Sequence, residues 1–405
     1  MKRLYLDYAA TTPLDPRVKR AMEPYFAKHF GNPSSIHAEG VVAKKALDAA
    51  RATVARALEA HPDEIIFTSG GTESNNLAIF GAVESVCRSL TPTRPVGVKL
   101  LQKPRLHIIT TNIEHSSVLE PLRALEKRGV EVSYVPVETN GIVKTEKILA
   151  AIRPNTVLVS VMYANNEIGT IQPIAKIGKA IRELRGEAHK KNLVRVGAPF
   201  PLFHTDACQT PLYLNCLVNA LGVDLLTLDG HKIYGPKGVG ALYVRRGTTL
   251  APQLLGGGQE RGLRSTTENI SSIVGFAEAL RLATTERKTE SLRLKELRDK
   301  FYADVLENIR TTRIILNGDR ENRLPNNLNI SLPKVDTEML VLKLDAAGIA
   351  CSTKSSCLKD EKRSYVIAAL GGDEKRAESS LRFTLGHTTT AHDLARVAKI
   401  LSRIV

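Results

Sequence analysis

The sequence Leu225-Leu226-Thr227-Leu228-Asp229-Gly230-His231-Lys232-Ile233-Tyr234-Gly235-Pro236-Lys237-Gly238 carries the strongest structural signal in this chain. Its apolar half predicts a buried strand, and the Gly and Pro residues that follow predict a loop. The strand would therefore place the pair His231-Lys232 at its carboxyl end. Desolvation of an amine lowers its pKa and makes it nucleophilic, as Schiff-base chemistry requires. Taken alone, the pair is more typical of a solvated surface loop, so a functional interpretation depends on the rest of the chain.

The length and composition are those of a globular protein with more than one domain. Its 405 residues exceed what one simple core holds, so one large domain and one smaller domain are expected. A hydrophobic content of 43% and a charged content of 24% argue against a disordered chain. No apolar run reaches the roughly 18–20 residues that span a bilayer. An acid, Asp7, appears too early for a signal peptide, so we expect no membrane association and a cytoplasmic location.

The charge and the cysteines exclude some classes of site. The formal net charge of +15 is compatible with a polyanionic partner such as RNA. Lysine and arginine are, however, spread along the chain, so we expect general basicity and no dedicated nucleic-acid site. The five cysteines are odd in number and form no CxxC pair, which argues against a disulfide framework or a zinc site. We expect no bound metal, mostly buried cysteines, and one reactive cysteine.

Strand and helix patterns alternate from about Ile65 to Val244. This alternation predicts an α/β fold with a mostly parallel sheet that helices cover on both faces. Ligands of such sheets bind at the carboxyl ends of the strands. Six polar residues fall at or just beyond predicted strand ends: Thr72, His115, Asn166, Asp206, His231 and Lys232. Their convergence predicts one ligand site at this edge of the sheet.

Individual parts of this edge allow two interpretations each. The run Thr68-Ser69-Gly70-Gly71-Thr72 leads from a strand into a helix, where free amides, a hydroxyl and a closely approaching backbone form an anion cradle. An ordinary capped helix has the same pattern, and the ending of a Walker loop is missing. His115 is placed either to stack on a flat ring or to cap a helix. The amides of Asn165 and Asn166 either bind a ligand or form a turn.

The alternation of strand and helix patterns ends after Val244. A Gly-rich loop, residues 256–267, precedes a long helix in which Leu294, Leu297, Phe301 and Val305 form a stripe that predicts core packing. A short apolar run then enters a polar loop, residues 348–361. We expect a large domain at 15–255, a small domain made of 1–14 and 256–405, and basic surface insertions at 90–105 and 185–201.

Seven motifs, which run nearly end to end, resemble those of the cysteine desulfurases (NifS/IscS-like), a group of the class V aminotransferase family: Leu6–Thr12, Phe30–Ser35, Thr68–Ser74, Asn165–Gly169, Asp206–Gln209, Gly230–Gly238 and Arg382–Gly386. Enzymes of this family use pyridoxal 5'-phosphate (PLP). The resemblance implies the PLP-dependent transferase fold of type I. That fold has a large domain with a mostly parallel seven-stranded sheet, and a smaller α+β domain that here would carry a mobile cysteine loop.

The resemblance assigns five residues to the ring of the cofactor. Lys232 would form a Schiff base with PLP, and Asp206 would pair with the pyridinium nitrogen and keep the ring an electron sink. His115 would stack on the ring and shuttle protons. Asn166 and Gln209 would hydrogen-bond the phenolic oxygen of the cofactor.

The resemblance also assigns residues to the phosphate and the substrate. Gly71, Thr72 and His231 would hold the phosphate, and Thr267 would reach the phosphate of a neighbouring subunit, which implies a homodimer. Arg382 would bind the substrate carboxylate with its two-pronged guanidinium.

Cys357 stands where this family carries its nucleophile. The implied reaction removes sulfur from L-cysteine, releases L-alanine and leaves a persulfide on Cys357. A mobile loop would deliver that persulfide to an acceptor, such as an iron–sulfur scaffold protein, for cluster assembly or tRNA thiolation. Lys354 and Lys359 would favour the thiolate. An inert loop cysteine is the alternative, with Cys351 as the second candidate nucleophile, and the sequence leaves open whether Cys357 also binds a transferring cluster.

The chain departs from the family pattern at several positions. Asp229 replaces a usual Ser that binds the phosphate, and we expect its carboxylate either to turn away or to bind a neighbouring donor. Lys354, Ser356 and His387 also replace usual residues. Two rival functions remain. One is a selenocysteine lyase or another class V enzyme, and the other is a basic scaffold or RNA-binding protein without turnover, which Asp229 motivates.

Overall fold

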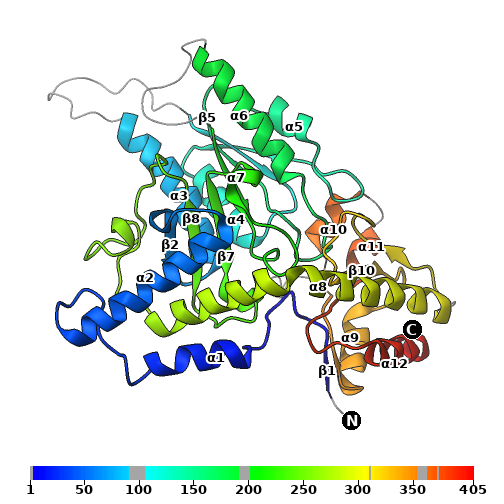
Figure 1. Cartoon of the computed structure of the whole chain (residues 1–405). Coiled ribbons are helices and arrows are strands. Elements are labelled where there is room, and N and C mark those ends of the chain that lie inside the picture. The colour runs from blue at the N-terminus through cyan, green and yellow to red at the C-terminus, as the bar shows by residue number, and fades with distance from the viewer. Residues whose placement is uncertain (1–2, 91–104, 191–200, 310–311, 354–362, 372–373) are drawn as a thin grey trace.

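The structure is a computed structural model that describes residues 3–90, 105–190, 201–309, 312–353, 363–371 and 374–405. Within these residues a seven-stranded sheet lies at the centre of the larger part of the molecule, in the order β2-β8-β7-β6-β5-β3-β4 (Figure 1). Strand β8 runs antiparallel to β2 and β7, and all other neighbours pair in parallel, which confirms the predicted sheet. The strands are β2 (Ile65–Thr68), β3 (His107–Thr111), β4 (Glu131–Val135), β5 (Thr156–Ser160), β6 (Leu202–Asp206), β7 (Leu225–Asp229) and β8 (Gly240–Val244).

Both faces of this sheet are covered. All residues of β3, β5, β6 and β7 are buried. Leu226 and Leu228 belong to one hydrophobic core, whereas Leu225 belongs to a second one. Because successive side chains of a strand point to opposite faces, the sheet separates these two cores. Continuous apolar strands such as β7 are therefore the expected sequence of a parallel sheet between two helical layers.

Helices supply the covering layers. Helix α3 packs across β5, β6, β7 and β8, and α4 packs on α3 and β4. The helices of this part are α1 (Pro16–Met22), α2 (Ala38–Leu58), α3 (Gly71–Leu90), α4 (Ser116–Glu126), α5 (Thr145–Ala150), α6 (Ile174–Lys190) and α7 (Val218–Leu221).

A smaller part is formed by β1, at the start of the chain, together with elements that follow α8. Its antiparallel sheet has the order β12-β10-β9, and a separate parallel pair joins β1 to β11. Its elements are β1 (Leu4–Tyr5), β9 (Ile315–Leu316), β10 (Asn327–Ser331), β11 (Ile349–Ala350), β12 (Ser380–Thr384), α9 (Thr337–Ala346), α10 (Tyr365–Ala369), α11 (Glu374–Glu378) and α12 (Ala391–Ile404). The domain boundaries at residues 14 and 255 stay a prediction.

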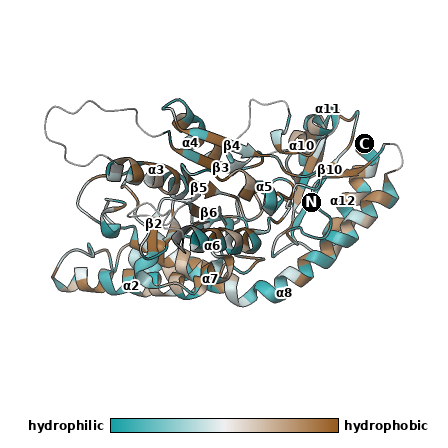
Figure 2. Ribbon diagram, turned by 90° about the horizontal axis from the view of Figure 1, so that it is seen from above, coloured by the Kyte–Doolittle hydropathy of each residue, from teal (hydrophilic) through white to brown (hydrophobic). Residues whose placement is uncertain are grey.

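The long helix α8 (Ile270–Asn308) runs across both parts in Figure 1. Leu294, Phe301 and Val305 are buried and Leu297 packs against the same core, which confirms the predicted stripe. Its outward-facing turns are mostly hydrophilic (Figure 2). Among the described helices, none combines the length and apolar character needed to cross a membrane.

One predicted insertion begins later than expected. The basic segment 185–201 was expected to be a surface insertion, but α6 continues through its first residues to Lys190. Arg185 explains the difference, because its guanidinium pairs with the buried Asp224 at 2.5 Å and thereby fixes this turn of the helix to the sheet. Residues 191–200 and most of the other insertion, 91–104, lie outside the described residues.

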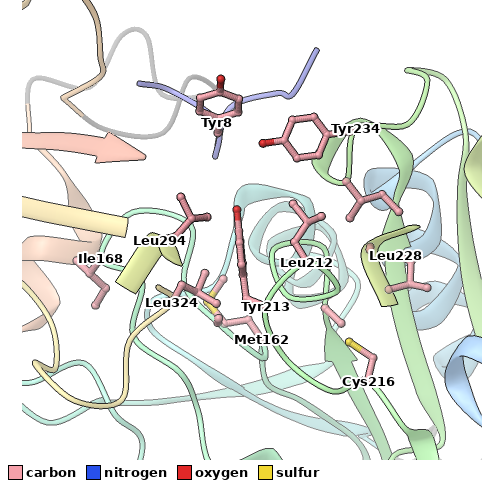
Figure 3. Close-up of a cluster of buried hydrophobic side chains, with 14 of the residues drawn as sticks. Tyr8, Met162, Ile168, Leu212, Tyr213, Cys216, Leu228, Tyr234, Leu294 and Leu324 are labelled. Carbon is pink, nitrogen blue, oxygen red and sulfur yellow. The ribbon is translucent and has the colours of Figure 1, made fainter. Parts of the chain in front are cut away.

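A cluster of buried side chains lies where the two parts meet (Figure 3). Tyr8, which follows β1, lies with its ring centroid 6.0 Å from that of Tyr234, and its hydroxyl hydrogen-bonds Thr388. Leu294 of α8 and Leu324, which precedes β10, belong to the same core. This packing fixes the segment that follows β1 across the carboxyl end of β7.

Candidate active site

Lys232 ends a short 3-10 helix, η3 (Gly230–Lys232), that directly follows β7. The loop is fixed by the segment after β1, since the amide of Thr12 donates to the carbonyl of His231 at 2.9 Å. The Lys232 Nζ donates to the carbonyls of Ala9 and Ala10 at 2.8 and 2.7 Å. The amine is thus half-buried and held at a defined position, which differs from the solvated surface lysine that the sequence left open.

A cavity of about 190 Å³ opens beside this amine. Nine of the predicted site residues line it: Gly71, Thr72, His115, Asn166, Asp206, Gln209, His231, Lys232 and Arg382. They come from α3, the start of α4, the ends of β5, β6 and β7, and β12. Thr267 lies outside this cavity and is exposed, so its expected contact with a neighbouring subunit stays a prediction.

A chain of hydrogen bonds connects Asp206 to His115. Asn75 Nδ2 donates to Asp206 Oδ2 and to Ser117 Oγ, each at 2.8 Å, and Ser117 Oγ lies 2.8 Å from His115 Nδ1. The other oxygen of Asp206 accepts from the amide of Cys208 at 3.0 Å. Since Asn75, Ser117 and Asp206 are all buried, this network holds the carboxylate in one orientation.

His115 caps a helix, one of its two predicted roles, and stacking on a flat ring stays a prediction. It caps α4, because its Nδ1 accepts from the amide of Ser117 at 3.2 Å, and its ring also lines the cavity. An amide N–H can only donate, so Nδ1 is the acceptor and the proton of the neutral ring resides on Nε2.

The side-chain amides of Asn165 and Asn166 have different roles. Asn165 is structural, because its Oδ1 accepts from the amides of Glu167 and Ile168 and its Nδ2 donates to the Ile113 carbonyl. Asn166 lines the cavity. Gln209 also lines the cavity, and its Nε2 donates to the Ala9 carbonyl at 3.1 Å.

Arg382 enters the cavity from β12 and is only 1% exposed. Its Nη2 pairs with Asp7 Oδ1 at 2.6 Å, and its Nη1 donates to the Asn166 carbonyl at 3.0 Å. The Nε is buried without a hydrogen-bond partner in the described part of the chain. A buried guanidinium with one unsatisfied donor at a cavity wall is suited to bind an anion.

The start of α3 is occupied by an unexpected group. Asp229 Oδ2 accepts from the amide of Gly71 at 2.7 Å and lies 3.5 Å from His231 Nε2. The carboxylate therefore does not turn away from the cavity but binds a neighbouring donor, the second of the two predicted outcomes. A Cβ on Gly71 would approach Cys208 Sγ to 2.7 Å, so only glycine brings the backbone this close.

Comparison with known proteins places this geometry in a family. The family model for class V aminotransferases matches residues 4–397. The chain belongs to the class V aminotransferase family. A relative named cysteine desulfurase IscS, from Dictyoglomus turgidum, is 45% identical over 407 residues, with 100% of this chain and 95% of the relative covered.

Solved structures agree with the fold and the family. A NifS-like protein is 34% identical with a TM-score of 0.86, and 99% of each chain is covered. SspA, solved in complex with cysteine, is 33% identical with a TM-score of 0.76, and 94% of this chain and 98% of SspA are covered. The family and the fold that the motifs predicted are thus confirmed.

The cysteines of this family member differ in environment. Cys357 and the flanking Lys354 and Lys359 lie outside the described residues. Cys351, the second candidate nucleophile, is buried directly after β11, and burial, with the nearby Asp7 charge, raises its pKa to about 12. The four described cysteines form no disulfide.

Sequence reasoning missed three residues of this site: Asp7, Asn75 and Ser117. Asn75 lies one helical turn after Gly71, so helical spacing could have placed it on the same face of α3. Ser117 could have been found as the first-turn partner of a histidine cap. Asp7 gave no local signal, because its contact with Arg382 depends on the tertiary fold.

Proposed function

We propose that this chain is a cysteine desulfurase. It removes the sulfur of L-cysteine with the help of PLP, releases L-alanine and retains the sulfur as a persulfide on Cys357. The observation that supports this proposal most strongly is that the Lys232 amine, the Asp206 carboxylate and Arg382 line one cavity. The activity named for the Dictyoglomus turgidum relative supports the same proposal.

The residues of the cavity fit PLP. Asp206 is a buried carboxylate that Asn75 orients, as a partner of a pyridinium nitrogen requires. The start of α3 brings the Gly71 amide, which Asp229 binds in this structure, and the Thr72 hydroxyl to the cavity, where a phosphate would bind. Lys232 would hold the cofactor through its amine. When bound, PLP supplies an electron sink that stabilises negative charge at the Cα of an amino acid.

His115 and Lys232 would move protons. The proton of His115 resides on Nε2, and the network through Ser117 and Asn75 fixes the ring over the cavity. Lys232, once its amine is free, lies at the same cavity and would exchange a proton with the Cα of the substrate. Gln209 and Asn166 would orient the cofactor from the cavity wall.

Arg382 would bind the carboxylate of L-cysteine. Its Nε has no hydrogen-bond partner among the described residues and would donate to the substrate carboxylate, while Asp7 and the Asn166 carbonyl fix the other two nitrogens. The bound amino acid would then present its sulfur to the Cys357 thiolate. The Cβ–S bond of the substrate breaks, a sulfur–sulfur bond to Cys357 forms, and the carbon skeleton takes up protons to become alanine.

We also propose a homodimer that passes sulfur to an acceptor protein. Phe30, Ile36 and Leu255 are large apolar side chains with 72%, 98% and 79% exposure, which is unusual for a monomer surface and supports a subunit contact. Thr267 would reach the cofactor phosphate of the partner. The predicted cytoplasmic location stays a prediction.

Visible absorption of the purified chain, with and without L-cysteine, tests the proposal together with an alanine assay. We expect bound PLP to give a visible band that cysteine shifts, and alanine to be released. Lys232→Ala should lose both. A colourless protein that does not take up added PLP would contradict the proposal and favour the scaffold alternative.

A further inference from the structure

Asp229 places a negative charge at the start of α3, where the family resemblance predicts that the cofactor phosphate binds. It is the last residue of β7, and its carboxylate lines the cavity. Oδ2 accepts from the Gly71 amide at 2.7 Å, and Oδ1 accepts from the His231 amide at 3.2 Å. The same two residues, Gly71 and His231, are those that the family resemblance assigns to the phosphate.

The surroundings keep this carboxylate ionised. Burial raises the pKa of Asp229, but the hydrogen bond and charge of His231, the Gly71 amide and the charge of Lys232 outweigh burial and lower it overall. Asp206 and Cys208, from the end of β6, line the same cavity, and the charges of Asp206 and Asp229 help to raise the pKa of the Cys208 thiol. Asp229 thus satisfies donors that a phosphate would otherwise use.

The Gly71 amide already donates to Asp229 Oδ2 at 2.7 Å, so a phosphate oxygen at this amide would have to share it with the carboxylate or displace it. One N–H donates fully to one acceptor, and two anions at hydrogen-bond distance repel each other strongly when they are partly desolvated.

We infer that Asp229 competes with the phosphate of PLP for the Gly71 amide and for His231, and thereby sets the affinity of this chain for the phosphorylated cofactor. The inference rests on the proposed function, since it concerns the same cofactor. The chain would bind PLP more weakly than a family member with Ser at this position, and would exchange it more readily. Pyridoxal, which lacks the phosphate, would not meet this competition.

Dissociation constants of the apoprotein for PLP and for pyridoxal, measured by absorption or fluorescence titration, test the inference without turnover. Asp229→Asn keeps the shape and an acceptor oxygen but removes the charge, and Asp229→Ser restores the family residue. Both variants should bind PLP about tenfold or more tightly than the native chain, with little change for pyridoxal. Asp206→Asn is the matched control, because it removes another carboxylate of the same cavity and should weaken both ligands alike.

Circular dichroism of each apoprotein checks that the variants fold. Unchanged or weaker PLP binding by folded Asp229→Asn would overturn the inference, as would equal tightening for PLP and pyridoxal. Such results leave the proposed function intact, because PLP still binds. Failure of every variant, including Asp229→Ser, to bind PLP would instead overturn the proposed function and this inference together.

Discussion

Asp7 and the buried Arg382, 375 residues apart in the chain, form a partly buried ion pair of 2.6 Å at the wall of the cavity. Asp7 follows β1, and Arg382 lies in the middle of β12. The pair therefore connects the start of the chain to the small antiparallel sheet and aims the guanidinium into the site.

Asp7→Asn tests this connection. Removing one partner leaves Arg382 buried with an unpaired charge, so the free energy of unfolding should fall by about 3 kcal/mol. The KM for L-cysteine should rise more than kcat falls, because the substrate-binding guanidinium loses its orientation. Denaturant unfolding and steady-state kinetics measure the two effects. The control is Asp345→Asn, which breaks the exposed pair with Arg3 and should cost about 0–1 kcal/mol with unchanged kinetics.

Ser117→Ala removes the hydroxyl between Asn75 and His115 but keeps the amide that His115 caps. We expect kcat for alanine formation to fall about five- to tenfold, because one hydrogen bond that orients the ring is lost. The neighbouring Ser116→Ala, at the first position of α4, should behave as the native chain. Equal losses in the two variants would show that the effect is only helix destabilisation.

Cys357→Ala separates the desulfurase from the selenocysteine lyase alternative. A desulfurase should retain its PLP band but lose alanine formation from L-cysteine, whereas a selenocysteine lyase would still cleave selenocysteine. Cys351→Ala is the matched thiol control and should keep turnover, since a buried thiol with a pKa of about 12 is not a thiolate at neutral pH. Mass spectrometry after alkylation at pH 8 should accordingly find Cys351 unmodified in the folded protein. Loss of turnover in Cys351→Ala alone would reverse the assignment.

The buried carboxyl of Glu114 should make the free energy of unfolding depend on pH. Its carboxyl is fully buried between Thr111 and the amide of Met162, and burial raises its pKa from 4.5 to about 8. Between these values the unfolded chain releases a proton that the folded chain retains, so this group destabilises the fold progressively as pH rises from about 4.5 to 8. Denaturant unfolding of the native chain and of Glu114→Gln between pH 5 and 8 measures it. The native chain should lose stability relative to the variant as pH rises; parallel curves would contradict this origin.

The sequence predicted the fold and much of the site because the chemistry lies at the ends of parallel strands. Apolar runs such as Leu225–Leu228 indicate buried strands, and strands that run in parallel bring their carboxyl ends, with Asp206 and Lys232, to one edge. Arg382 was assigned only through the family motif, since its strand belongs to another sheet. No local sequence pattern shows which of Asn165 and Asn166 bonds within the turn and which lines the cavity.

The orientation of Asp229 and the end of α6 were not predictable, because each depends on a contact that only the tertiary fold brings about. The sequence could not decide whether Asp229 turns away, because that depends on the Gly71 amide that α3 presents to it. The continuation of α6 to Lys190 depended in the same way on the pairing of Arg185 with Asp224.

The parallel pair of β1 and β11 has a consequence for synthesis on the ribosome. Leu4 aligns with Ile349, and Asp7 pairs with Arg382, so these two residues have no sheet or ion-pair partner until residues 349 and 382 have been translated. The carbonyls of Ala9 and Ala10, which hold the Lys232 amine, belong to the segment that follows β1. A prematurely terminated chain would therefore contain the lysine but not the anchored backbone that positions it.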